Sequence, residues 1–124
     1  MTTVQDVIGK IFAADESLDL EAFVALLARD AVMRVGAGPD VRGHPAIRSL
    51  VKGLFAAQRM GIKHHLIRTW PGRPVMAYQA EAAMALADGR DLVLPYVNVL
   101  TLDETGMITD YRVHIDMSPL SQSS

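Results

Sequence analysis

The stretch from Ile62 to Met117 constrains the fold of this chain more than any other, because apolar and polar residues alternate through most of it. Side chains point to alternate faces of a β-strand, so this period of two predicts extended segments. Turn residues interrupt the pattern three times, at P-G-R-P (71–74), at Asp88-Gly89 and at D-E-T-G (103–106). Short turns join antiparallel neighbours, and the stretch therefore predicts four strands of one curved antiparallel sheet.

The first half of the chain predicts helices. Apolar residues recur at helical spacing over residues 4–14, 20–28 and 45–60, with a short strand expected over 31–35. Helices followed by a meander imply an α+β domain, in which three N-terminal helices pack on the concave face of a cone-shaped, strongly curved antiparallel sheet. The tail S-P-L-S-Q-S-S is expected to be a frayed end.

Length and charge exclude several classes of protein. With 124 residues the chain is expected to form a single domain, residues 1–124. A formal net charge of -2 and the lack of a Lys/Arg cluster argue against nucleic-acid binding. No apolar run approaches the ~20 residues of a transmembrane helix, so no membrane partner is expected. No secretory signal is visible and there is no cysteine, which fits a cytoplasmic protein without disulfides or thiolate metal sites.

The turns also predict which residues face one another, because side chains alternate along each strand. If the residues flanking Asp88-Gly89 pair, Glu81 lies opposite Tyr96. If Leu102 pairs with Met107 at the last turn, Val113 lies beside Tyr96. The P-G-R-P turn is looser but brings His65 opposite Glu81.

One face of the predicted sheet is therefore apolar, with a row formed by His65, Glu81 and Tyr96 and with Asn98 one step along. A mostly apolar concavity with a few converging polar groups is typical of a small-molecule site. We expect these four residues to be the catalytic candidates. Further side chains are expected to contact a hydrophobic ligand: Gln79, Tyr111, Met33, Val35, Met60, Leu94, Val113 and Ile115.

The row has the parts for general acid–base catalysis. We expect one of two arrangements: a carboxylate beside His65 that fixes the tautomer of the imidazole, or burial that makes Glu81 itself the acid or base. Tyr96 and Asn98 can donate hydrogen bonds to a carbonyl or enolate oxygen. Dehydration, isomerisation or cyclisation next to a carbonyl would need no cofactor. Each residue also has a purely structural reading, as a buried side chain with a local hydrogen-bond partner.

The adjacent histidines argue against a metal site, because neighbouring side chains on a strand point to opposite faces. His64 is therefore expected to point away from the pocket, as is Tyr78. The opposite face mixes apolar residues, such as Val93 and Val97, with charged ones. Such a surface fits a homodimer interface.

Three segments carry a resemblance to a known family: D-L-E-A-F-V-A-L-L-A-R-D-A-V (19–32), V-R-G-H-P-A-I (41–47) and L-P-Y-V-N-V-L-T-L-D-E-T-G-M-I-T-D-Y-R-V-H-I-D (94–116). With the order of elements, they resemble the nuclear transport factor 2-like superfamily, and within it the SnoaL-like proteins. The resemblance covers about residues 4–120 and implies a cone-shaped scaffold. That scaffold serves isomerases, dehydratases, epoxide hydrolases, polyketide cyclases and non-enzymes, so activity has to be argued from the site.

Individual enzymes of the superfamily match unevenly. The strand H-L-I-R-T-W is similar to the one that opens with the catalytic histidine of scytalone dehydratase, which implies that role for His65, with Asn98 as the pocket asparagine and Glu16 as a supporting carboxylate. Similarity to limonene epoxide hydrolase retains only the carboxylate at Glu81. The base aspartate of ketosteroid isomerases would fall at Val35.

Three functions are thus expected in order. The first is a cofactor-free lyase, isomerase or cyclase that uses His65 and Glu81 on a hydrophobic, carbonyl-bearing molecule of polyketide, terpenoid or steroid type. The second is epoxide opening through Glu81. The third is a non-catalytic binding or assembly domain. Both enzyme hypotheses require His65 and Glu81 to face the same cavity.

Overall fold

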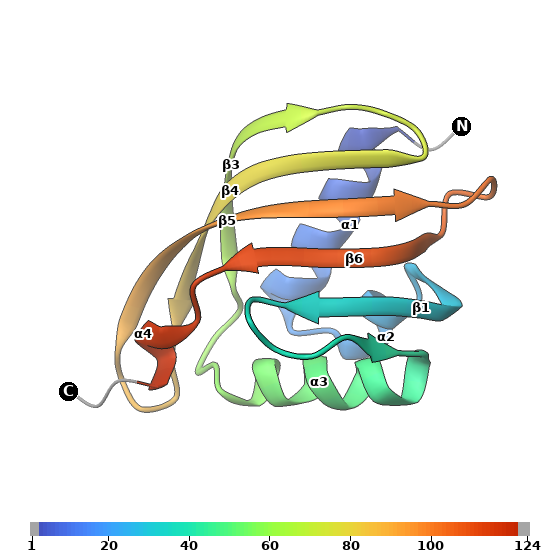
Figure 1. Cartoon of the computed structure of the whole chain (residues 1–124). Coiled ribbons are helices and arrows are strands. Elements are labelled where there is room, and N and C mark those ends of the chain that lie inside the picture. Colours follow the sequence, from blue (N-terminus) through green and yellow to red (C-terminus); the bar gives the residue numbers. More distant parts are fainter. Residues whose placement is uncertain (1–2, 122–124) are drawn as a thin grey trace.

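The computed structural model describes residues 3–121 as an α+β domain with a six-stranded mixed sheet and four helices (Figure 1). The elements in chain order are α1 (Val4–Ser17), α2 (Leu20–Val24), β1 (Leu27–Val35), β2 (Val41–Arg42), α3 (His44–Ala56), β3 (Lys63–Trp70), β4 (Val75–Ala85), β5 (Asp91–Leu102), β6 (Ile108–Ile115) and α4 (Ser118–Ser121). The strand order in the sheet is β2-β1-β6-β5-β4-β3.

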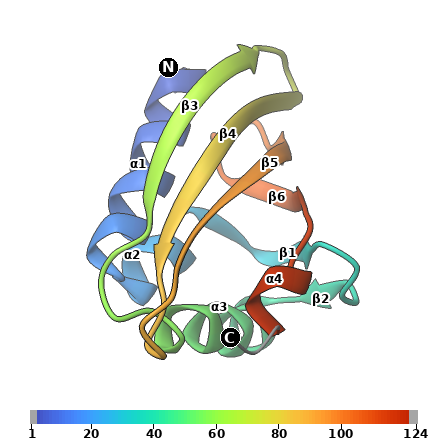
Figure 2. The ribbon, with the colours of Figure 1, turned by 90° about the vertical axis from the view of Figure 1, so that its left-hand side faces the viewer.

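The sheet is strongly bent but not closed, with β2 and β3 as its edges (Figure 2). The predicted four-stranded antiparallel meander is confirmed as β3–β6. The expectation of a wholly antiparallel sheet is wrong, because β1 pairs with β6 in parallel. A long connection through α3 and four strands, β2 to β5, joins β1 to β6, and turn motifs predict only neighbours that short loops join.

The helices begin where the sequence supplies caps. Thr3 and Asp6 form a reciprocal capping box at the start of α1, with distances of 3.1 Å and 3.0 Å. Asp19 caps α2 by accepting from the backbone N–H of Ala22. This helix was predicted to end at residue 28 but ends at Val24, because Leu27 already pairs with Ile108 of β6.

One core fills the space between the helices and the inner face of the sheet. It includes Ile11, Phe23, Ile47, Tyr78 and Leu100, all buried. Figures 1 and 2 show α1 along the bent sheet, α3 across one end of it, and α4 near that same end. The helix α4 was not predicted, since residues 118–121 were expected to be frayed; residues 122–124 of that tail lie outside the described residues.

The β4–β5 hairpin departs from its predicted register by one residue: Glu81 lies opposite Pro95, and Ala80 lies opposite Tyr96. A two-residue loop of type I′ needs positive φ at both central residues. Here only Gly89 has it, at 97°. The backbone N–H of Gly89 donates to Leu86, which closes a type I turn with a glycine bulge and lengthens the loop to three residues. The extra residue turns β4 over.

The β5–β6 hairpin differs from its prediction by two residues, since Val113 lies opposite Asn98 and not Tyr96. One residue comes from a second glycine-bulge loop, where Gly106 has a φ of 87°. The other comes from a bulge between Thr101 and Leu102. Two shifts of one residue restore the parity, so β5 and β6 present the predicted side chains to the inner face.

The β3–β4 pairing confirms that His65 lies opposite Glu81. Because β4 is turned over, this pair lies on the outer face of the sheet. His64 takes the inner position, opposite buried Ala82.

Candidate active site

A cavity of about 90 Å³ lies between the inner face of the sheet and the helices. Seven of the predicted site residues line it: Met33, Val35, Tyr96, Asn98, Tyr111, Val113 and Ile115. Most other lining side chains are apolar, from α2, α3, β4 and the C-terminal segment, and Asp15, Gln58 and His64 add polar groups. The cavity thus has the predicted apolar character with few polar groups.

The other predicted residues lie elsewhere. His65, exposed, and Glu81, half-buried, lie on the outer face together with half-buried Gln79. Met60 is 55% exposed, and Leu94 is buried without lining the cavity. The predicted His65–Glu81–Tyr96 row is therefore wrong. The predictions that His64 and Tyr78 face outward are wrong for the same reason, the reversed face of β4.

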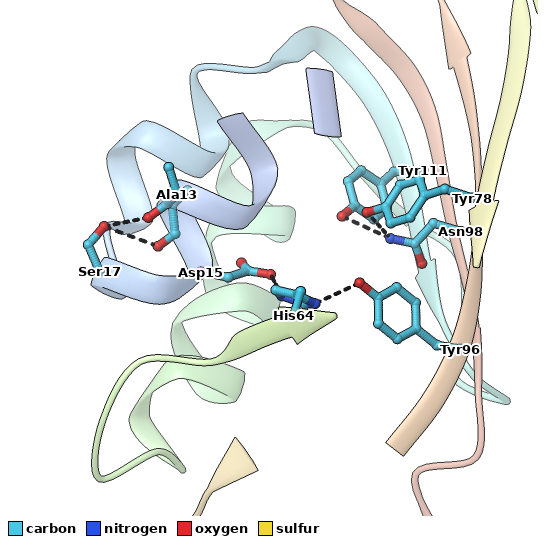
Figure 3. Close-up of polar contacts among 9 residues, drawn as sticks. Ala13, Asp15, Ser17, His64, Tyr78, Tyr96, Asn98 and Tyr111 are labelled. Carbon is cyan, nitrogen blue, oxygen red and sulfur yellow. Dashed lines mark hydrogen bonds and ion pairs between the residues drawn. The ribbon is translucent and has the colours of Figure 1, made fainter. Parts of the chain in front are cut away.

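A carboxylate, an imidazole and a phenol form a hydrogen-bonded chain at the cavity wall (Figure 3). Nε2 of His64 lies 2.8 Å from Oδ2 of Asp15, and Nδ1 of His64 lies 2.6 Å from the hydroxyl of Tyr96. The histidine side chain is only 7% exposed and the aspartate 13%. Asp15 comes from α1, His64 from β3 and Tyr96 from β5. The hydrogen-bonded chain therefore crosses from a helix to the sheet.

The chemistry of the partners fixes the direction of these bonds. An ionised carboxylate only accepts, so the proton of a neutral His64 ring lies on Nε2. Nδ1 then accepts the hydroxyl proton of Tyr96. The order carboxylate, imidazole, hydroxyl is that of a Ser-His-Asp triad, with a phenol in place of the serine.

Local packing holds the imidazole in this orientation. The ring of Phe12 stacks on His64, with centroids 4.5 Å apart and planes within 8°. The backbone N–H of Ile62, at the entry to β3, donates to the carbonyl of Asp15. Gly61 lies so close to α1 that a Cβ there would come within 1.6 Å of the carbonyl oxygen of Glu16. Backbone contact therefore fixes the start of β3 against the end of α1.

A second cluster lies beside the chain. The amide nitrogen of Asn98 donates to the hydroxyls of Tyr78, at 2.7 Å, and Tyr111, at 3.3 Å. The pKa of Tyr96 is raised far above its ordinary value. Burial is the largest cause, and the nearby Tyr78 and Asp15 add to it. Burial likewise raises the pKa of Tyr78 and of Tyr111. These phenols stay protonated in the folded protein, and Tyr96 meets the cavity as a neutral hydroxyl.

The sequence contained a signal for two of these residues, Asp15 and His64. Asp15 follows Ile8 and Ile11 on the buried stripe of α1, and a carboxylate on a buried stripe needs a partner. The resemblance to scytalone dehydratase pointed to this junction but to the neighbouring residues, Glu16 and His65. Glu16 is exposed, whereas Asp15 makes the contact.

Within residues 3–121, no three His, Asp or Glu side chains lie close enough together to hold a metal ion. None of the helices in that range is both long and apolar enough to cross a membrane.

Comparison with solved structures shows where this fold occurs. An NTF2-like protein of unknown function from Exiguobacterium is 20% identical, with a TM-score of 0.76 over 89% of this chain and 98% of its own. Rv0760c from Mycobacterium tuberculosis, solved with estradiol-17β-hemisuccinate, is 18% identical, with a TM-score of 0.77 over 90% and 92%. SalBIII, an epoxide hydrolase/cyclase-like enzyme of pyran ring formation in salinomycin, is 18% identical, with a TM-score of 0.79 over 92% and 91%.

At these identities the likeness establishes only that the chain shares the fold of these proteins, one of which is described as NTF2-like. A family model described as a SnoaL-like domain matches residues 8–111. The chain belongs to the SnoaL-like domain family. Comparison with curated proteins gives no match.

Proposed function

We propose that the cavity is an active site for cofactor-free general acid–base catalysis on a small, largely apolar molecule. The observation that carries the proposal is the Asp15–His64–Tyr96 chain, with contacts of 2.8 Å and 2.6 Å, beside an apolar cavity. It replaces the His65–Glu81 pair, which does not reach the cavity. The steroid derivative bound to Rv0760c and the cyclase-like description of SalBIII support a small-molecule role for this fold.

We assign one role to each group on the basis of its contacts. Both ring nitrogens of His64 are already engaged, so Tyr96 is the residue that touches the substrate. Its oxygen takes a proton from an acidic carbon of the substrate while its own proton passes to Nδ1 of His64. The imidazolium that forms is stabilised by ionised Asp15. Because the pKa of Tyr96 is raised, a free phenolate is disfavoured, and the two proton transfers occur together.

Reversal of the relay completes the reaction. The proton returns from His64 through Tyr96, either to another carbon, which gives isomerisation, or to a hydroxyl that leaves as water, which gives dehydration. Atoms and charges balance in both cases without a cofactor. A carbonyl next to the reacting carbon makes that carbon acidic enough for the first step, which is why a carbonyl-bearing substrate is proposed.

A panel of β-hydroxy ketones, β,γ-unsaturated ketones and epoxides tests the proposal. We expect turnover of at least one ketone class, and Tyr96→Phe, His64→Gln and Asp15→Asn should each lower kcat/KM by about 10²–10⁴-fold. The matched control is His65→Gln, the adjacent histidine on the other face, which should leave kcat/KM unchanged. Equal losses in the His64 and His65 variants, or none in either, would refute the relay.

Epoxide opening remains the second candidate because SalBIII is described as epoxide hydrolase/cyclase-like. It cannot use Glu81 as predicted, since that carboxylate lies on the outer face. Turnover confined to epoxides would favour it. Ligand binding without turnover by any variant would favour the non-catalytic reading.

We also propose that the outer face of the sheet forms a homodimer. Several large apolar side chains there are exposed, among them Val93 (61%), Val75 (49%) and Trp70 (46%). They lie among charged residues, as in the predicted interface. Light scattering should give twice the mass of the chain, and Val93→Asp should give the monomer. A wild-type monomer at micromolar concentration would contradict this assignment.

A further inference from the structure

The cavity wall contains two polar atoms without partners. Oδ1 of Asn98 and Oε1 of Gln58 are buried and accept no hydrogen bond from any residue within 3–121. The residues are 3% and 9% exposed, and both line the cavity. Most buried polar groups in proteins are paired, so two unpaired acceptors on one small cavity require an explanation.

Three donors on this wall already have acceptors in the protein. The amide nitrogen of Asn98 donates to Tyr78 and Tyr111, and that of Gln58 donates to the carbonyl of Leu54, at 3.4 Å. These bonds orient both amides with nitrogen toward the protein. The hydroxyl proton of Tyr96 is taken by His64. The wall therefore presents two unpaired acceptors, the side-chain oxygens of Asn98 and Gln58.

We infer that the natural ligand is hydroxylated: it presents hydrogen-bond donors, one to Asn98 and one to Gln58, from an otherwise apolar frame. The inference rests on the proposed function in taking this cavity as the substrate site, and it narrows the substrate class. A ketone or an epoxide oxygen only accepts, so neither group alone can pair with these two amide oxygens. A hydroxylated carbonyl compound can, and its hydroxyl group is what dehydration removes.

The size of the cavity limits the part of the ligand that enters. A cavity of about 150 Å³ in another protein holds benzene, and this one measures about 90 Å³. The buried, donor-bearing part is thus of the order of one small ring. The rest of a larger ligand has to lie outside the cavity.

Calorimetric titration of the full chain with matched phenols tests the inference. Resorcinol, its monomethyl ether and its dimethyl ether share one ring and lose one donor at each step, and the same series on hydroquinone changes the spacing. In at least one series we expect each methylation to weaken binding by about tenfold, because a buried acceptor is left unpaired. Binding of the diol should also shift the side-chain amide resonances of Asn98 and Gln58.

Variants separate this effect from general packing. Gln58→Met keeps the length of the side chain but removes the acceptor. In this variant one of the two methylations should no longer weaken binding. Gln79→Met is the same change on the outer face, and in this variant both methylations should still weaken binding. Ethers that bind within about threefold of the diols in both series, the same preference in Gln58→Met, or no binding by any phenol would each overturn the inference.

The outcome is distinguishable from a failure of the proposed chemistry. Diol selectivity in a protein whose turnover is indifferent to Tyr96→Phe and His64→Gln would retain the ligand class and remove the relay. Loss of turnover in those variants without diol selectivity would retain the relay and remove the ligand class.

Discussion

All three tyrosines of the chain stand in the network beside the cavity, which makes alkaline titration a sharp test of the site. Tyr78, Tyr96 and Tyr111 are 0%, 5% and 3% exposed. Burial is the largest cause of the raised pKa of each. We predict that no tyrosine in the folded protein ionises near pH 10, where an exposed tyrosine does.

The raised pKa values link ionisation to stability. Since the folded state holds these protons more tightly than the unfolded state, their contribution is fully present below about pH 10 and is lost as the pH rises above it. One tyrosine that ionises only when unfolded costs about 1.4 kcal/mol of unfolding free energy by about pH 11. Three such residues cost about 4 kcal/mol, a large part of a typical total of about 5–15 kcal/mol.

Phenolate absorbance and far-ultraviolet circular dichroism, recorded on the same samples, measure the effect. We expect phenolate absorbance and loss of ellipticity to appear together, in one cooperative transition with a midpoint well above pH 10. Tyr78→Phe should remove one third of the final absorbance and serves as the calibration. Phenolate signal for even one tyrosine near pH 10, with ellipticity intact, would refute the burial argument.

Three further changes test the scaffold. Gly61→Ala should lower the unfolding free energy by roughly 2–4 kcal/mol in urea denaturation, because its Cβ would overlap the backbone of Glu16; a neutral result would contradict that contact. Leu100→Ala should cost about 2–5 kcal/mol by the same measurement, as the side chain is fully buried, and a loss below about 1 kcal/mol would count against this core. Arg90→Gln should speed amide hydrogen exchange in α4, since the guanidinium donates to two carbonyls there; unchanged exchange would mean that it does not hold the helix.

The sequence predicted the architecture better than the site, and particular residues show why. The positions of the three turns and of the meander follow from local chemistry. At two of these turns Gly89 and Gly106 supply the positive φ that the loop needs. The inner faces of β5 and β6 were also right, although through two one-residue errors that cancelled. The parallel β1–β6 pair and helix α4 depend on long-range packing, which no local motif predicts.

The prediction of the site failed because of one loop, the β4–β5 hairpin loop. Asp-Gly occurs both in two-residue and in three-residue hairpin loops, and only the two-residue reading was used. The difference is one residue, which is enough to exchange the faces of β4 and, through the correct β3–β4 register, the positions of His64 and His65. Local sequence does not distinguish the two loops.

Contacts far from the loop in sequence distinguish them. The backbone N–H of Ala87 donates to Ala57 at 2.8 Å, and that of Arg59 donates to Ala85 at 2.7 Å, so the end of β4 pairs with the segment after α3. A two-residue loop would need Ala87 to pair with Arg90 instead, and its N–H would have to leave Ala57. The docking of this hairpin on the end of α3 therefore selects the longer loop, and through it the histidine that reaches the cavity.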